Sequence, residues 1–205
     1  MVQKFILPLL TAMLIASPFV AAAAHADPAE IALLGRDPGT KSAYACFVRH
    51  YDAAHLASHP QQNVRDISMF VQSIYQPAQG SDAASRTDSI ELGFNFKGVK
   101  RPIQATGSCS VVDGEAGLTC GIDCDGGSFN VTTTAATGAI VGIPNPISMW
   151  DAQAPDDQPN LLPKGAVLGS DDKSFALDRV DLKQCDGLMT DEAKADIYGT
   201  KKVAQ

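Results

Sequence analysis

The stretch CSVVDGEAGLTCGIDCDGG, residues 109–127, holds three of the five cysteines and decides how the rest of the chain is interpreted. Two short apolar runs, one ending at Val112 and one beginning at Gly117, flank Asp-Gly-Glu-Ala, and this pattern is typical of a β-hairpin. If residues 112 and 117 pair, Cys109 lies directly opposite Cys120, within the distance that a disulfide spans. The register of the hairpin therefore predicts a Cys109–Cys120 disulfide.

The other cysteines suggest a second bridge. Cys120, Ile122 and Cys124 share one face of a strand by its two-residue period, and we expect this face to point toward the core. We predict that Cys124 pairs with Cys185, because Cys185 ends the last expected strand and the bridge would close a loop of about 60 residues. Cys46 is then the unpaired cysteine, and we expect it to be a buried thiol.

The first 26 residues have the features of a secretory signal peptide. They combine a basic start at Lys4 with a long apolar run and close on the small-residue pattern Ala24-His25-Ala26. We therefore expect this segment to be removed on export, leaving a periplasmic or extracellular protein without a membrane span. An oxidising compartment favours disulfides over free thiols and metal ligands.

The charge balance limits the kinds of partner. Once Lys4 is lost with the leader, the 16 basic residues become 15 against 23 acidic ones, a net charge of −8. Such a chain repels nucleic acid and anionic lipid, so we expect neither as a partner. Aromatic residues make up only 6% of the chain, which leaves little for recognition of sugars by stacking. The partner we expect is a small apolar ligand or a cell-envelope protein, and no cofactor is implied.

Short apolar and polar alternations recur throughout the mature chain and predict an all-β fold. The clearest runs from residue 90 to 96, and the last is an expected hairpin over 164–168 and 174–182. About nine or ten short strands at such spacing indicate an antiparallel meander that forms a barrel or a sandwich. We expect a helical turn over 52–59, before Pro60 stops it, and a C-terminal helix over 190–198.

The expected organisation is a single domain. We assign residues 1–26 to the signal peptide, 27–42 to an N-terminal arm, 43–187 to the β domain and 188–205 to a C-terminal helix and tail. A mature chain of this length suffices for one domain with a sizeable core.

A zinc site is the main alternative to the disulfide interpretation. His55 and His59 lie one helical turn apart, and Cys120 and Cys124 are separated by three residues. Two imidazoles and two thiolates would complete a tetrahedral structural zinc site. This alternative would make the chain a metal-handling protein, and it requires both cysteines to be reduced.

Catalytic patterns are weak, and we assign no catalytic residue. Ser58 stands beside His59, but neighbours in sequence do not form a triad, and no Gly-x-Ser-x-Gly turn is present in the sequence. On a strand, His50 and Asp52 share a face while Tyr51 points away. A hydrolase would need a cleft that joins a histidine to a serine and a carboxylate.

Three stretches carry a resemblance to known proteins. They are residues 46–62 with the spacing C-x2-R-x-Y-D-x2-H-L-x2-H-P, residues 120–127 with C-G-x-D-C-D-G-G, and the run DDKSFALDR at 171–179. Together they resemble a group of small exported bacterial proteins of unassigned function, over residues 43 to about 186. The resemblance implies a shared exported fold and no activity. We therefore expect an exported, disulfide-stabilised β domain with a non-enzymatic binding or structural role.

Overall fold

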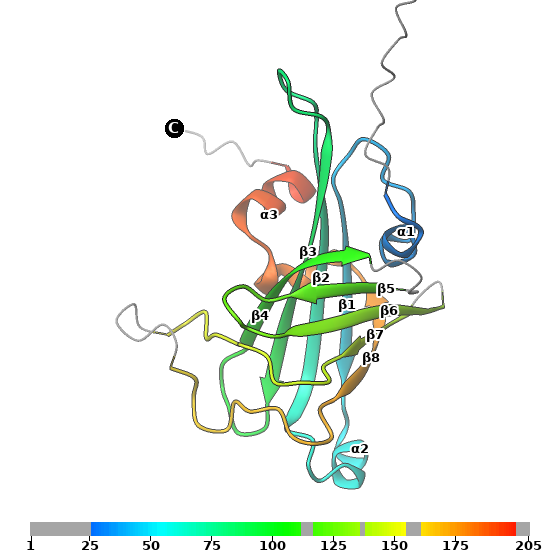
Figure 1. The fold of residues 1–205 in the computed structure, drawn as a ribbon. Helices are drawn as coiled ribbons and strands as arrows, with labels where there is room; N and C mark the ends of the chain where they lie inside the picture. Colours follow the sequence, from blue (N-terminus) through cyan, green and yellow to red (C-terminus); the bar gives the residue numbers. More distant parts are fainter. Residues whose placement is uncertain (1–25, 112–116, 136–137, 155–160, 200–205) are drawn as a thin grey trace, which may run out of the picture.

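The computed structural model describes residues 26–111, 117–135, 138–154 and 161–199, and these form a closed antiparallel β-barrel (Figure 1). Each strand pairs with the next along the chain, and the last pairs with the first, so that Phe47 lies opposite Arg179. The strands are β1 (Ala43–His50), β2 (Val64–Gln76), β3 (Ser85–Phe96), β4 (Ile103–Val111), β5 (Gly117–Gly121), β6 (Ser128–Ala135), β7 (Gly138–Gly142) and β8 (Ser174–Val180). The helices are α1 (Pro28–Leu34), α2 (Ala53–Ser58), the 3-10 helix η1 (Leu182–Leu188) and α3 (Asp191–Tyr198).

The predicted all-β antiparallel meander is confirmed, and of the two expected architectures the structure has the barrel. The number of strands among the described residues is eight rather than nine or ten. The first arm of the expected cysteine hairpin is the end of a longer strand, β4, and residues 164–168, expected as the first arm of the last hairpin, form no strand. Residues 147–150 contribute only an isolated bridge from Trp150 to Gln104. β5 pairs with residues 108–111 of β4, and Trp150 pairs with Gln104 on the part of that edge that β5 leaves free.

Alternating side chains fill the barrel. On β3 the predicted inward residues Ile90, Leu92, Phe94 and Phe96 are fully buried. Other large side chains join them in the same cluster, among them Phe47, Phe129, Phe175, Ile67, Met69 and Ile103. Burying a side chain of this size stabilises the fold by about 1.5–3 kcal/mol. The interior is therefore a packed core.

Helices cover one end and one outer face of the barrel. α1 begins with the capping box of Asp27 and Glu30, and its residues Leu33 and Leu34 belong to the main core. The segment predicted as an N-terminal arm thus contributes to the interior. η1 and α3 lie against the outside of β1 and β2, where Phe70 is the largest member of a second buried cluster (Figure 1).

The two predicted helices are confirmed. Asp52 accepts a hydrogen bond from the His55 backbone at 2.7 Å and caps α2, which ends before Pro60. Thr190 caps α3 in the same way, at 3.2 Å from the Ala193 nitrogen. Among the described helices none is both long and apolar enough to cross a membrane.

Candidate functional site

The disulfide between β4 and β5 lies where the hairpin register predicts it. Cys109 and Cys120 are direct partners in the ladder, with Cα atoms 4.0 Å apart, and their sulfur atoms are bonded. Gly107 makes room for this bridge, because a Cβ at that position would lie 2.8 Å from both Cys120 Cβ and an atom of the Phe129 ring. The predicted Cys109–Cys120 bridge is confirmed.

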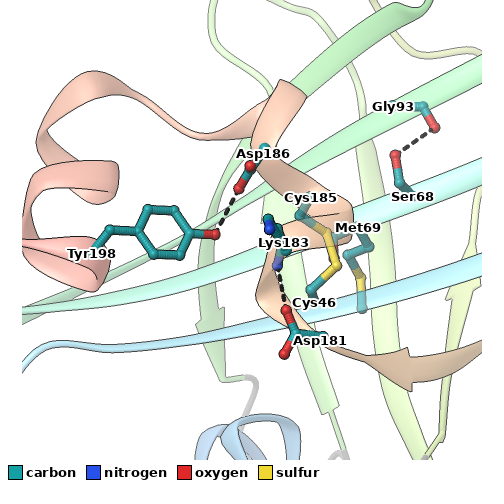
Figure 2. The surroundings of a disulfide bond; sticks show 9 residues. All are labelled: Cys46, Ser68, Met69, Gly93, Asp181, Lys183, Cys185, Asp186 and Tyr198. Carbon is teal, nitrogen blue, oxygen red and sulfur yellow. Dashed lines mark hydrogen bonds between the residues drawn. A yellow bond between two sulfur atoms is a disulfide. The ribbon is translucent and has the colours of Figure 1, made fainter.

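The second disulfide joins Cys46 to Cys185, so the predicted Cys124–Cys185 bridge is wrong (Figure 2). On β1, Phe47 points into the barrel, and Cys46 therefore points outward, where η1 packs. Because β8 pairs with β1, the segment that follows β8 brings Cys185 directly over Cys46. Cys124 is exposed and unbonded, since β5 ends at Gly121 and Cys124 lies in the following turn with a φ of 54°.

The predicted zinc set of His55, His59, Cys120 and Cys124 does not assemble. The sulfur of Cys120 is bonded to Cys109 and is no longer a thiolate. The His55 ring stacks on His59 with centroids 4.2 Å apart, and its Nε2 lies 3.0 Å from Gln62 Oε1. Within the described part of the chain, no three His, Cys, Asp or Glu side chains come together in a way that could hold a metal ion.

The residues weighed for acid–base chemistry have structural partners. His50 Nδ1 contacts Asp66 across the ladder, and the two residues are register partners of β1 and β2. Tyr51 is buried, and burial raises the pKa of its hydroxyl. Ser58 Oγ donates to the His55 carbonyl at 2.8 Å and lies 3.1 Å from His59 Nδ1. The contact of His50 joins the end of β1 to β2, and the contacts of Ser58 stabilise the last turn of α2.

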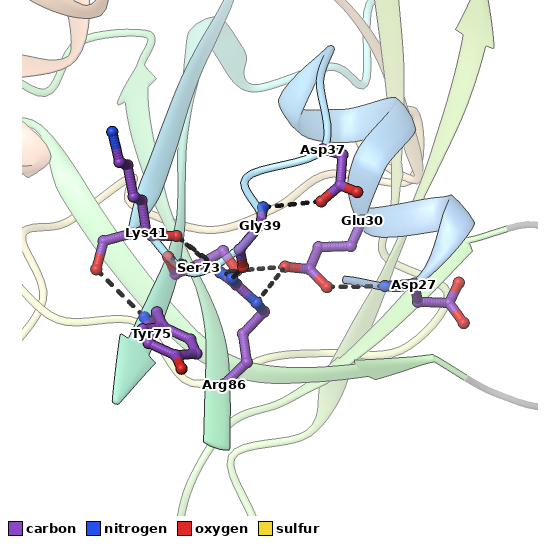
Figure 3. A network of polar contacts seen from close by, with 9 residues as sticks. Asp27, Glu30, Asp37, Gly39, Lys41, Ser73, Tyr75 and Arg86 are labelled. Carbon is purple, nitrogen blue, oxygen red and sulfur yellow. Dashed lines mark hydrogen bonds and ion pairs between the residues drawn. The ribbon is translucent and has the colours of Figure 1, made fainter. Parts of the chain in front are cut away.

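A buried polar cluster lies where α1 meets the barrel (Figure 3). The side chains of Glu30 and Arg86 are only 4% and 5% exposed, with Oε1 and Nε 3.7 Å apart. Ser73 donates to Glu30 and accepts from Arg86 Nη1 at 2.9 Å. Arg86 also donates to the Gly39 carbonyl, which holds the loop after α1 against the barrel. The cluster thus ties α1, β2 and β3 together.

Asp88 adds a second carboxylate to this cluster. It faces Ser73 in the ladder of β2 and β3, and its Oδ1 is buried without a hydrogen-bond partner. Burial, together with the negative charge of Glu30, raises the pKa of Asp88 from 3.8 to about 6, although Ser73 and Arg86 oppose the shift. The pair of acids is therefore only partly neutralised by one guanidinium.

Residues 77–89 have the small and polar composition of a surface loop, and for this reason the sequence did not predict the cluster. A signal was present. Continuing the inward period of Ile90 and Leu92 backward reaches Asp88 and Arg86, which occupy the same face of β3.

Replacing Asp88 with asparagine should change the pH dependence of stability. The protonated form of a carboxyl with a raised pKa stabilises the fold below pH about 4, and this contribution is lost as the pH rises through about 6. Asp88→Asn should therefore gain about 1–2 kcal/mol over the parent at pH 7, after allowance for solvent screening, and nothing at pH 4. The prediction applies to a chain in which Asp27 keeps its peptide bond to Ala26. Urea unfolding of both proteins between pH 4 and 8 measures it, and a pH-independent difference would contradict it.

An apolar pocket of about 250 Å³ lies in the connection between the end of β7 and the start of β8. This end of the barrel is opposite the end that carries α1 (Figure 1). Its apolar walls come from two segments, one after β7 and one before β8. The apolar lining residues are Pro146, Ile147, Met149, Leu162, Ala166, Val167 and Leu168. Asn145 and Lys173 complete the lining, and Lys173 is its one charged side chain among the described residues.

A second, larger hollow of about 530 Å³ is polar. It lies between the loop after α1 and the helix α3, and Arg36, Lys41, Tyr44 and Asp196 are among its lining residues. The Tyr44 hydroxyl donates to Asp196 at 2.8 Å, and burial is the main cause that raises the pKa of this tyrosine. This hydrogen bond joins β1 to α3 across the hollow.

The fold and its contents define a class of protein, a closed eight-stranded antiparallel barrel with a filled interior and two disulfides. Searches against protein-family models, curated proteins and solved structures find no match. The pocket and the polar cluster are therefore the features that can indicate a function.

Proposed function

We propose that this protein is an exported, disulfide-stabilised binding domain without enzymatic activity, and that it holds a small apolar ligand in the pocket of Ile147, Met149 and Val167. The observation that carries the proposal is the pocket. It is a mostly apolar concavity on a barrel whose own interior is full. Apolar concavities with few polar groups are the usual sites for small ligands.

The chemistry of the lining sets the class of ligand. Ile147, Met149 and Leu162 pack against the barrel core on one side and line the pocket on the other. Val167 at the rim is 63% exposed, which leaves apolar surface in contact with water when the pocket is empty. A compact hydrocarbon or aromatic group would cover this surface. The volume of about 250 Å³ favours a ligand at the small end of the usual range.

The location of the protein is part of the proposal. A removable signal peptide over residues 1–26, the acidic mature chain and the resemblance to exported bacterial proteins all favour the periplasm or the exterior. The two disulfides agree with an oxidising compartment. A stable, cross-linked barrel suits a binding domain that works outside the cytoplasm.

Binding of N-phenyl-1-naphthylamine, a neutral apolar fluorescent probe, tests the pocket. We expect saturable binding to the parent protein, and Val167→Asp should weaken it about tenfold or more, because a carboxylate at the rim must be desolvated by the probe. Leu161→Asp is the matched control, since Leu161 is 64% exposed in the same segment but does not line the pocket. Equal affinities of the parent and Val167→Asp, or equal losses in both variants, would refute the assignment.

A further inference from the structure

The backbone nitrogen of Asp27 lies in a distinctive position. It donates to Glu30 Oε2 at 3.1 Å, and Glu30 is buried at the end of the barrel (Figure 3). Asp27 is also the first residue after the predicted cleavage point at Ala26. Removal of the leader would therefore place a new amino terminus directly against a buried carboxylate.

We propose that cleavage between Ala26 and Asp27 creates an α-ammonium group that forms an ion pair with Glu30 and fastens α1 to the mature barrel. The inference rests on the proposed export, because the leader must be removed. In the cleavage step water adds across the peptide bond. The leader leaves with a new carboxylate on Ala26, whose proton is released, and the freed amine of Asp27 takes up one proton, so that no net proton is exchanged with solvent. One neutral N–H donor thus becomes a cation with three donors.

The charges around this position favour a cation. Glu30 on α1 and Asp88 on β3 are two carboxylates, whereas Arg86 on β3 is the one guanidinium that faces them among the residues that the structure describes. Ser73 on β2 is neutral, and the carboxylate of Asp27 already accepts from the Ala29 nitrogen at 2.9 Å. An additional positive charge balances the buried pair. The helix dipole opposes a cation at this end, so the stabilisation must come from the carboxylates.

The new ion pair would complete the attachment of α1. At the other end of the helix, the Arg179 guanidinium donates to the carbonyls of Leu33 and Leu34, and it lies 4.6 Å from the centre of the Phe47 ring. Leu33 is buried in the main core between these two attachments. Maturation would thus add a positive charge at the end of the helix where an amide N–H now donates to the Glu30 carboxylate.

Two chains that differ only at the amino terminus test the proposal. One begins at Asp27, released from a ubiquitin-like fusion whose protease leaves no extra residue. The other begins at Ala24, which moves the amine three residues away. Urea unfolding at pH 6.5 should give an unfolding constant about tenfold smaller for the chain that begins at Asp27, because an ammonium replaces a neutral amide as the donor to the Glu30 carboxylate.

The same pair of chains carrying Glu30→Gln is the control. Since Ala26 is buried, its loss changes packing as well as charge, and this packing effect is common to both backgrounds. With glutamine at position 30, we expect the ratio of the two unfolding constants to change by about tenfold, which leaves the packing effect alone. In the parent at pH about 10, where an α-amine is neutral, the ratio should fall to the same packing effect. Asp88→Asn should also have a smaller effect in the chain that begins at Asp27.

An unchanged difference in the Glu30→Gln background would overturn the ion pair. A separate measurement tests whether the protein is exported and cleaved as proposed. The intact mass of protein recovered from the periplasm or medium shows whether the chain begins at Asp27. A different amino terminus there would refute the maturation step even if the engineered chains behaved as expected.

Discussion

Replacing both Cys46 and Cys185 with alanine is expected to lower the free energy of unfolding by about 5 kcal/mol. This loss is larger than the one expected from removing the other disulfide. The Cys46–Cys185 bridge spans 139 residues, and in the chain-entropy model a loop of that length restricts the unfolded chain by about this amount. Cys109 and Cys120 are only 11 residues apart, so removing their bridge should lower stability by about 3 kcal/mol. Guanidinium unfolding of the double variants under non-reducing conditions measures both values.

Cys124→Ala is the control for the loss of a sulfur atom without the loss of a bridge. Cys124 is exposed and unbonded, so this variant should match the parent within about 0.5 kcal/mol. If the two disulfide variants lost equal stability, restriction of the unfolded chain would not explain the effect. Packing of Cys185 and Met189 between η1 and the barrel would then contribute most of the stabilisation.

The two disulfides show which contacts a sequence makes predictable. The Cys109–Cys120 bridge follows from the register of one hairpin, and every residue that sets this register lies within the hairpin itself. The Cys46–Cys185 bridge depends on the pairing of β1 with β8, which closes the barrel. Periodicity indicates that both segments are strands but does not indicate that they are neighbours.

The polar cluster was missed for a different reason. Arg86 and Asp88 occupy inward positions of β3, yet charged residues normally mark the outward face or a loop. Their burial becomes acceptable only because α1 brings Glu30 to the same place, from a segment that precedes the barrel. The pocket was missed because its walls are irregular segments, including residues 164–168, which were expected to form a strand. No periodic pattern fixes the path of such segments.

Replacing Asp172 with alanine should lower the free energy of unfolding by about 3–5 kcal/mol, because the buried carboxylate accepts hydrogen bonds from several backbone N–H groups. It accepts from the nitrogens of Asn63 and Gly169, both at 2.8 Å, and from that of Val64 at 3.3 Å. The side chain is fully buried, so water cannot replace it without opening the barrel end. Urea unfolding of the variant measures the loss.

The neighbouring residue provides a matched control. Asp171 is exposed and accepts one hydrogen bond from the Gln61 nitrogen at 3.1 Å, so Asp171→Ala should lose less than about 1 kcal/mol. Asp172→Asn should recover part of the loss, since the amide oxygen still accepts from two donors while its NH₂ group faces the third. If Asp171→Ala and Asp172→Ala lost the same stability, the carboxylate of Asp172 would not be what joins the start of β2 to the segment before β8. That segment also carries Val167 and Leu168, so the loss of Asp172 should weaken probe binding as well as the fold.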